Sequence, residues 1–398
     1  MIAVGIDVSK SKSTVAIIDS DGQILLKPRN YNHTVSDMLN LITLINSYPQ
    51  DVKVAMEATG HYHYPILKVL LEENMHVSLI NPYLMKKYGD NSIRKGKTDK
   101  KDAMRIAFYV LEKSYLLKPY TAADQKYSDL KFLSRQYQQS ITLKTKARIQ
   151  LNNLLDEIMP GIQKLFSSNN AVSPTQNLFL DFLEKYESFD KIRKMGEKRF
   201  ISSFSKFTVK RRTRNAQYKA LAIYELASNS ITTRNSDTST LIALHQCISI
   251  LRQCTEATNN LLAQMHSIAF TMTEYSTIRA MNGVGNKLAP QLIAEIGDIR
   301  RFTSAKALNA YAGNDAPAYQ SGNFEGTNRH ISKRGSAPLR KACYEVMQAL
   351  KLHKCEEDPI YQFMLKKEAE GKPKNVAKMA GVNKFLHIYY ARVMELYK

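Results

Sequence analysis

Two aspartates, Asp99 and Asp102, stand three residues apart in the lysine-rich stretch GKTDKKDA, residues 96–103. In a helix this spacing puts both carboxylates on one face, one turn apart, where their charges repel each other. The neighbouring lysines relieve that repulsion only in part. A bound Mg²⁺ would turn the repulsion into a function, because hard divalent cations are held by carboxylate oxygens. The spacing therefore indicates metal-dependent chemistry.

Two further acids lie on segments that are predicted to be strands. Asp7 belongs to the alternating run IAVGIDV, where it shares its side of the strand with only Ala3 and Gly5. That side is an unusual place for a charge unless it ends in a polar cleft. Glu57 closes the run VKVAME, after which ATG lets the backbone turn away. A single acid of this kind is usually structural, whereas an ordered set on the right elements favours a site.

The elements that must position these acids follow from the hydrophobic pattern of the first 120 residues. Period-2 or continuous apolar runs predict five strands, and helices are predicted after the third, fourth and fifth of them; the strand segments are 2–8, 13–19, 23–27, 52–57 and 76–82. The order βββ-α-β-α-β-α is the plan of a ribonuclease-H-like domain, in which strands 1 and 4 are neighbours and the final helix packs across their ends.

The four acids would then converge. Four carboxylates suit two Mg²⁺ ions about 4 Å apart, which clamp the attacking and leaving oxygens of a phosphodiester.

The net charge indicates a polyanionic partner. The chain of 398 residues has 57 Lys and Arg against 36 Asp and Glu, a formal charge of +21, which is too large an excess for an ordinary metabolic enzyme. Each phosphate that is neutralised releases counterions and adds affinity. Neither an apolar run of membrane-spanning length nor a signal-peptide pattern is present in the sequence, so we expect no membrane contact and a cytoplasmic, nucleoid-associated protein in a bacterium. The cations expected to hold DNA against the metals are Arg94, Lys97, Lys100 and Lys101.

Two long helices are predicted beyond the first domain, over 124–159 and 240–272, with apolar residues at 3/4 spacing. They are compatible with an antiparallel hairpin or with a dimerising coiled coil. Between them, residues 191–219 hold eleven Lys and Arg and a single acid, Glu197. Such a run is either a solvated face or a nucleic-acid contact, and the sequence favours neither. From about 274 onward a helical pattern with glycine-rich interruptions predicts a separate all-α domain. We therefore expect three domains, 1–122, 123–273 and 274–398.

Several ordered motifs resemble the DEDD transposases of bacterial insertion sequences, a family of bridge-RNA-guided serine recombinases. The resemblance rests on GIDVSK, MEATGHY, INP, KTDKKDA, NGVG, YQSGNFEG, ISKRGS and LRKA, and it spans nearly the whole chain except about 165–240. It implies a RuvC-like N-terminal domain, a coiled-coil segment and a C-terminal transposase domain. It also implies an enzyme that excises and inserts its own element, with DNA and a guide RNA as partners. Its members assemble the active site from two protomers, so a dimer or tetramer is expected.

The resemblance assigns roles to particular residues. Asp7, Glu57, Asp99 and Asp102 match the metal-binding tetrad, and Ser321 in YQSG matches the nucleophile, which would attack a DNA phosphodiester and form a covalent protein–DNA intermediate. On spacing alone, Ser321 reads as an ordinary turn residue. The alternatives are a metal-dependent junction-resolving nuclease, which needs the tetrad and no serine, and a non-catalytic scaffold that binds nucleic acid.

Further contacts to nucleic acid are expected in the C-terminal domain. The NGVG turn resembles a helix-hairpin-helix turn, in which Gly283 and Gly285 would hold a phosphate through backbone amides; a simple helix N-terminus is an equal alternative. The other expected phosphate ligands are Lys333, Arg334, Arg340, Lys372 and Lys374. The sequence departs from the family pattern at Asn314, where an apolar residue is usual, and at Asn282-Gly283, where Pro-Gly is usual.

Overall fold

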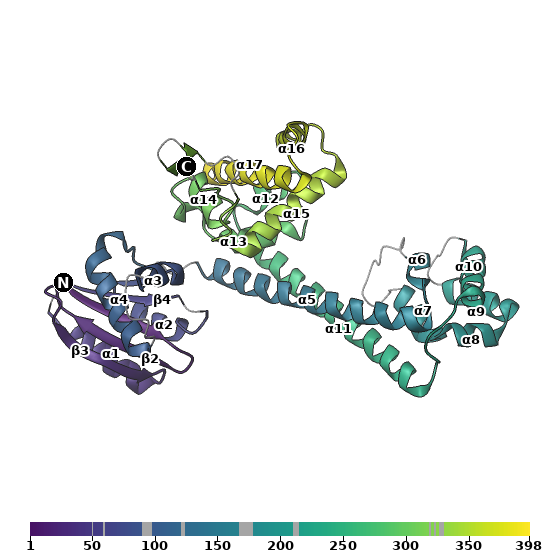
Figure 1. Ribbon diagram of the computed structural model, residues 1–398, viewed down its shortest axis with the longest axis horizontal. Helices are drawn as coiled ribbons and strands as arrows, with labels where there is room; N and C mark the ends of the chain where they lie inside the picture. Colours follow the sequence, from purple (N-terminus) through teal and green to yellow (C-terminus); the bar gives the residue numbers. More distant parts are fainter. Residues whose placement is uncertain are drawn as a thin grey trace. The chain divides into compact units, whose positions relative to one another are not determined.

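The chain divides into two units, Met1–Ala122 and Ala123–Lys398, in a computed structural model (Figure 1). The structure describes residues 1–49, 51–58, 60–89, 98–120, 124–166, 178–209, 215–317, 320–321, 324–325 and 330–398. The division between the two units lies at the expected domain boundary after residue 122. The other expected boundary, after residue 273, lies inside the second unit. The boundary at residue 273 stays a prediction.

The N-terminal unit is built on a five-stranded mixed sheet in the order β3-β2-β1-β4-β5. β1 pairs antiparallel with β2 and parallel with β4, so strands 1 and 4 are neighbours, as expected. Gly22 adopts a φ of +80° in the turn between β2 and β3, a conformation that glycine enters without steric penalty. This order is consistent with a ribonuclease-H-like domain. The strands are β1 (Ile2–Val8), β2 (Lys12–Ile18), β3 (Ile24–Asn32), β4 (Val52–Glu57) and β5 (Val77–Ile80).

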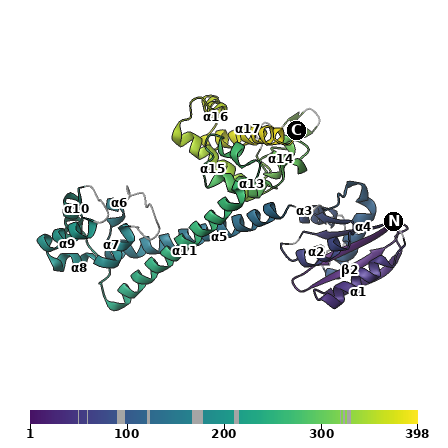
Figure 2. The same cartoon turned by 180° about the vertical axis from the view of Figure 1, so that it is seen from behind.

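Helices cover both faces of this sheet (Figures 1 and 2). The large side chains of β1 point to the face covered by α1 (Val35–Asn46) and α2 (Tyr64–Glu72). Thr34 caps the start of α1, because its side chain accepts a hydrogen bond from the Asp37 N–H. The small side chains of β1 point to the opposite face, which packs against α3 (Pro82–Gly89) and α4 (Asp99–Lys113).

The packing of α4 on β1 is unusually close and depends on small residues. A Cβ atom added at Gly5 would overlap the backbone nitrogen of Ala107 and the carbonyl oxygen of Ala103. Ala3 and Ala55 are fully buried in the same layer, where a larger side chain would hold the helix away from the strands. The glycine that shares a strand face with Asp7 is therefore required for the position of α4.

The C-terminal unit contains two long helices, α5 (Gln125–Ile158) and α11 (Thr238–Phe270), packed against each other. They run antiparallel, because the start of α5 and the end of α11 share one hydrophobic core while their opposite ends share another. The predicted helical hairpin is thus present within the chain; its supercoiling and any role in dimerisation stay predictions. A short 3-10 helix, Ser114–Leu116, closes the N-terminal unit.

Each end of this helix pair carries a helical domain (Figure 1). We call the first the inserted domain; it contains α6 (Ile162–Phe166), α7 (Leu178–Tyr186), α8 (Phe189–Met195), α9 (Glu197–Val209) and α10 (Ala216–Asn229). We call the second the C-terminal domain; it contains α12 (Tyr275–Arg279), α13 (Leu288–Ile296), α14 (Ala305–Tyr311), β6 (Gln320–Ser321), β7 (Phe324–Glu325), α15 (Ala337–His353), α16 (Pro359–Ala369) and α17 (Lys374–Glu395). In the parts of the chain that the structure describes, no helix combines the length and the apolar character that a bilayer crossing needs.

Replacing Gly5 by alanine tests the close packing of α4. The added methyl group has no space, so Gly5→Ala should lower the free energy of unfolding of the N-terminal unit by about 3 kcal/mol. The measurement is urea denaturation of the full chain with hydrogen exchange of the β1 amides as the readout. Gly285→Ala is the control, because its added Cβ meets nothing within 4 Å. Exchange in Gly5→Ala as slow as in the wild type would contradict this account of the packing.

Candidate active site

Asp7 and Glu57 lie side by side at the carboxyl ends of two parallel strands. The register pairs Gly5 with Ala55 and Ile6 with Met56, so Asp7 and Glu57 occupy the next position on each strand. Neighbouring strands are about 4.8 Å apart, and residues at matching positions point to the same face. That face packs against α4, and both acids are half-buried. The sheet therefore holds two carboxylates close together beside the helix.

The other two acids occupy the first turn of α4, at the same end of β1. The Asp99 carboxylate lies 4.0 Å from the Lys12 ammonium, and the Lys12 carbonyl accepts the N–H of Ser9, just beyond the end of β1. Asp99 and Asp102 differ in exposure, at 56% and 15% of their side-chain surfaces. Thr98 caps the helix through the N–H of Lys101, which fixes where the first turn begins.

Asp102 is already paired with a cation inside the protein. Its Oδ1 accepts a hydrogen bond of 2.9 Å from the Arg105 guanidinium, one turn further along α4. The Arg105 side chain lies against Gly89, where an added Cβ would stand 2.8 Å from its Nη1. Among the described residues, no three Asp, Glu, His or Cys side chains are grouped closely enough to hold a metal ion. The structure thus gathers the four residues at one end of the sheet without joining their carboxylates into one ligand set.

The expected cations around the acids are only partly described. Lys100 and Lys101 are exposed and, with Arg105, line an open cavity of about 680 Å³ on the outer side of α4. Burial and the hydrogen bond with Glu112 raise the pKa of Tyr88, in the same cavity, to about 12, so its hydroxyl keeps its proton at neutral pH. Arg94 and Lys97 lie outside the described residues.

Ser321 lies on a two-stranded antiparallel ribbon of the C-terminal domain. Its backbone in β6 pairs with that of Phe324 in β7, and Gln320 pairs with Glu325. The two short strands therefore run in opposite directions. The structure thus places the backbone of Ser321 on this ribbon.

The segment that carries Ser321 is closed at its base by a network that the sequence did not reveal. The Ser332 hydroxyl donates to the Asp315 carboxylate at 2.5 Å, and the Ser332 N–H donates to the Asp315 carbonyl at 2.7 Å. The Lys333 N–H donates to the Gly313 carbonyl at 3.0 Å, with Lys333 in the left-handed region at a φ of 54°. A Cβ at Gly335 would overlap backbone atoms of Tyr311 and Gly313. Ser332, Lys333 and Gly335 belong to the motif ISKRGS, but no motif or spacing relates them to Gly313 or Asp315, because the two groups meet only across the segment.

The predicted phosphate ligands of the C-terminal domain fall into two groups. Lys333, Arg334, Lys372 and Lys374 are exposed, as a backbone contact requires. Arg340 is different, because its guanidinium donates to the Ala312 carbonyl at 2.8 Å and lies against Gly313. The structure therefore gives Arg340 a part in supporting the Ser321 segment; its proposed contact with phosphate would need this hydrogen bond to be shared or broken.

The two glycines of the NGVG turn also differ from each other. Gly283 has a φ of +77°, and an added Cβ would stand 2.9 Å from the Leu350 side chain and from the Val346 carbonyl, so packing against α15 requires glycine here. Gly285 faces open space. Asn282 donates to Asp358 at 3.1 Å, which ties the turn to the start of α16. A packing role thus accounts for Gly283, and the phosphate contact of both glycines stays a prediction.

Two buried carboxylates join the C-terminal domain to α5. Glu274 accepts hydrogen bonds from Tyr127 at 2.6 Å and from Tyr397 at 3.2 Å, and burial together with these contacts raises the pKa of Tyr127. Glu295 accepts from Arg135 at 2.9 Å and from Ser336, which caps α15, at 3.1 Å. Sequence analysis missed both acids, because an isolated glutamate carries no motif, whether in the turn before α12 as Glu274 or within the apolar helix α13 as Glu295.

The departure from the family pattern at Asn314 has a structural role of its own. Asn314 is buried, and its amide donates to the Asn309 side chain at 3.0 Å and to the Met379 carbonyl at 3.2 Å. An apolar residue there would leave these acceptors without this donor. The polar side chain thus links α14 to α17.

Comparison with known proteins points to a single family. Residues 4–160 match a family model described as a transposase, of the DEDD and IS110 type, and residues 275–362 match the IS116/IS110/IS902 transposase family; together the two matches take in more than half of the chain. The chain is 22% identical to an uncharacterized 44.8 kDa protein of insertion element IS116 from Streptomyces clavuligerus, over 93% of this chain and 89% of that protein.

Two other relatives carry more informative names. A mini-circle putative transposase for IS117 from Streptomyces coelicolor is 24% identical, over 83% of this chain and 80% of its own length. A pilin gene-inverting protein from Moraxella bovis is 32% identical, over 30% of this chain and 37% of its own length. Both family matches leave out the inserted domain.

Removing the Ser332 hydroxyl tests the network below Ser321. Ser332→Ala deletes the bond to Asp315, worth about 1 kcal/mol, so we expect the amides of Ser332 and Lys333 to exchange hydrogen about fivefold faster. Hydrogen–deuterium exchange with mass spectrometry measures this rate. Thr271→Ala, which removes a hydroxyl that donates to the Ile268 carbonyl, is the control and should leave those amides unchanged. Unchanged exchange in Ser332→Ala would show that the network does not hold the segment.

Proposed function

Because this chain belongs to the IS116/IS110/IS902 family of transposases, we propose that it recombines DNA with the four acids of the N-terminal unit and the serine of the C-terminal domain. The observation that carries the proposal is the strand register that seats Asp7 beside Glu57, with the first turn of α4 at the same end of β1. The transposase activity itself agrees with the names of the relatives.

The chemistry of the four side chains fits a divalent cation. All four are carboxylates, which are the ligands that Mg²⁺ prefers, and Asp7 and Glu57 stand on adjacent strands. Asp102 would have to exchange Arg105 for the metal, and Asp99 would have to leave Lys12. When bound, one or two Mg²⁺ ions would supply charge stabilisation at the phosphodiester. Lys100 and Lys101, both exposed on the same turn, would hold the DNA backbone beside the acids.

In the proposed covalent step one phosphate ester bond replaces another, so the number of such bonds does not change. The Ser321 Oγ attacks a backbone phosphorus, a serine–phosphate bond forms, and the bond to one DNA oxygen breaks. The serine proton ends on that oxygen, which becomes a free hydroxyl. After strand exchange a hydroxyl of the new strand attacks the serine phosphate, and the serine recovers its proton. Hydrolysis does not occur, and no external reductant, oxidant or nucleotide is needed.

The proposal extends to the partners of the enzyme. Two protomers would combine the acids of one chain with Ser321 of the other, as a dimer or a tetramer. A guide RNA encoded by the element would select the DNA, and the charge of +21 supports binding of both polyanions. A structured non-coding segment beside the gene, with loops complementary to the element end and to the insertion site, would support the RNA part directly.

Asp7→Ala tests the role of the acids. Loss of a metal ligand should reduce element excision from a plasmid by at least about 100-fold, since removing even an outer partner of a ligand costs 10- to 100-fold in affinity or activity. Excision is scored by amplification across the donor junction. Asp21→Ala, an exposed acid of the same unit, is the matched control and should retain activity. Excision by Asp7→Ala at a rate near the wild type would exclude the metal role.

Ser321→Ala separates the recombinase from the alternative nuclease. We expect the wild type to form a covalent DNA adduct that is visible on a denaturing gel, and the variant to form neither adduct nor recombinant. Ser276→Ala, an exposed serine in α12, is the control. If Ser321→Ala still cuts DNA and the wild type forms no adduct, the enzyme is a metal-dependent nuclease. Mg²⁺-dependent cleavage of element-end DNA by the wild type that is lost in Asp102→Ala would exclude the scaffold, whereas no cleavage by the wild type would favour it.

A further inference from the structure

The inserted domain has a core of aromatic rings that face inward. Phe182, Tyr186, Phe200 and Phe204 are all at most 1% exposed, and neighbouring rings are in contact, as between Phe182 and Tyr186 with centroids 5.0 Å apart. Among the described residues of this domain, Tyr218 is the one exposed aromatic ring. The domain therefore offers little surface on which unpaired bases could stack.

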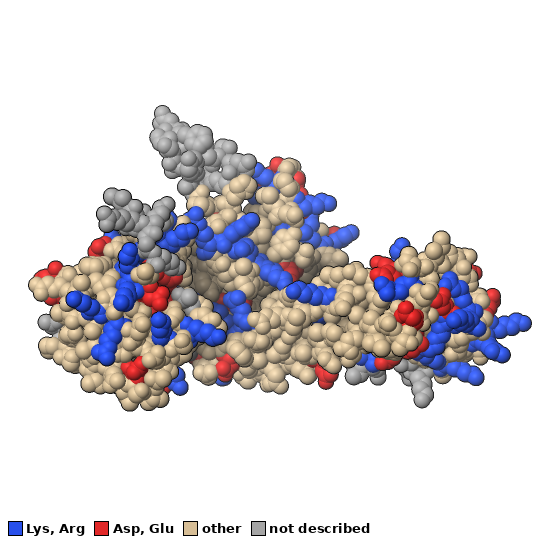
Figure 3. Space-filling model, turned by 60° about the horizontal axis from the view of Figure 1, so that its bottom comes forward, with Lys and Arg blue, Asp and Glu red and all other residues tan. Residues whose placement is uncertain are grey.

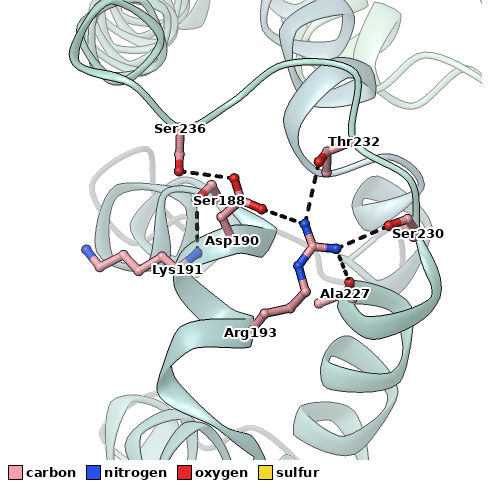
Figure 4. Close-up of polar contacts among 8 residues, drawn as sticks. All are labelled: Ser188, Asp190, Lys191, Arg193, Ala227, Ser230, Thr232 and Ser236. Carbon is pink, nitrogen blue, oxygen red and sulfur yellow. Dashed lines mark hydrogen bonds and ion pairs between the residues drawn. The ribbon is translucent and has the colours of Figure 1, made fainter.

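One arginine of the basic run helps to hold this domain together (Figure 4). The Arg193 guanidinium donates to the carbonyls of Ala227 at 2.9 Å and Ser230 at 3.2 Å, and to the Asp190 carboxylate at 2.5 Å. Asp190 accepts a further hydrogen bond from Ser236 at 3.3 Å, and the Arg193 hydrogen bond lowers its pKa. This network fixes α8 against the end of α10 and the segment that leads to α11.

A pocket lies beside this network and is lined mainly by cations and hydroxyls. Its volume is about 560 Å³, and Lys191, Lys194, Arg199, Ser188 and Ser236 contribute to its wall. Figure 4 shows how both hydroxyls are held: Ser236 donates to the Asp190 carboxylate, and Ser188 accepts the backbone N–H of Lys191 at 3.2 Å. The position of these hydroxyls is therefore set by the fold of the domain.

The negative charge near the pocket is already compensated. Glu187, also in the wall, accepts a hydrogen bond from Lys191 at 2.7 Å and lies 3.1 Å from the His245 ring. Burial acts to raise the pKa of Glu187, but its contacts with Lys191 and His245 outweigh burial, so the pKa lies below its usual value. Lys194 and Arg199 make no ion pair within the described ranges, and both are exposed. Their positive charge is available to a ligand.

The positive surface continues from the pocket along α9. Arg199 and Lys206 are seven residues apart, which places them on one face of the helix at a separation of about 10 Å along its axis. Lysine and arginine atoms gather on the inserted domain, at the right of the view in Figure 3. The cations thus form a surface, which we call the α9 basic surface and define by Lys194, Arg199 and Lys206.

We propose that the pocket and the α9 basic surface bind the phosphate backbone of duplex DNA. Cationic and hydroxyl side chains are the usual ligands of backbone phosphates, and the inward aromatic rings favour a paired helix over a single strand. The choice of DNA rests on the proposed function, since DNA is the substrate of a transposase. The inserted domain lies outside both matched family segments, so it would be an additional DNA anchor of this chain.

The test compares two doubly substituted full-length proteins of equal net charge. Lys194→Gln with Arg199→Gln removes two of the three cations of the α9 basic surface, whereas Lys126→Gln with Lys354→Gln removes two exposed lysines at the other end of the same unit. Binding of a fluorescent 30-base-pair DNA duplex, with EDTA present, is followed by anisotropy over a salt series. We expect the first protein to bind about tenfold more weakly, with a slope of log K against log [salt] smaller by about 2. The control should stay within about twofold, with an unchanged slope.

A single variant and a second ligand complete the experiment. Lys206→Gln, which lies outside the pocket, should lose about threefold with a slope smaller by about 1. Equal losses in both double variants would overturn the proposal, because net charge alone would explain them. A loss confined to an RNA duplex would overturn the assignment to DNA. Since no catalysis occurs in EDTA, Asp7→Ala should bind as the wild type does, which separates a failure here from a failure of the proposed chemistry.

Discussion

The close contact of α4 with β1 at Gly5 is the constraint on which the candidate site depends. Because this contact tolerates no side chain, the first turn of α4 is held at the end of β1, where Asp7 and Glu57 lie on adjacent strands. Like charges in such proximity need cations to offset their repulsion. The protein supplies Lys12 beside Asp99 and Arg105 beside Asp102, so a metal would have to displace these two partners.

In the C-terminal unit a comparable constraint comes from buried carboxylates between helices. A pair of helices held only by apolar contacts can slide, whereas a buried charge with a distant partner is satisfied in one register. Glu274 and Glu295 meet partners on α5 that lie 147 and 160 residues away in the sequence. Glu295 also bonds Ser336, next to the network below Ser321, so the register of α5 and the start of α15 are linked through one side chain.

The large excess of positive charge serves two different purposes. Arg193 and Arg340 donate to backbone carbonyls and act as structural ties, while Lys100, Lys101, Lys194 and Arg199 are exposed. A run of basic residues thus contains both kinds, only a few positions apart. The second kind provides the electrostatic attraction that a polyanion would feel, and the first kind gives the surfaces that carry it a fixed shape.

The sequence by itself determined the local structure and the kinds of chemistry available. Alternating and 3/4 apolar spacing predicted the five strands and the long helices α5 and α11, because these depend on residues near one another in the chain. The tertiary structure alone decided which cation meets which acid, that Arg340 supports a loop, and that Asp315 bonds Ser332. Such pairings depend on the distances between segments that are far apart in the sequence and come together only in the folded chain. No local pattern of residue types encodes those distances.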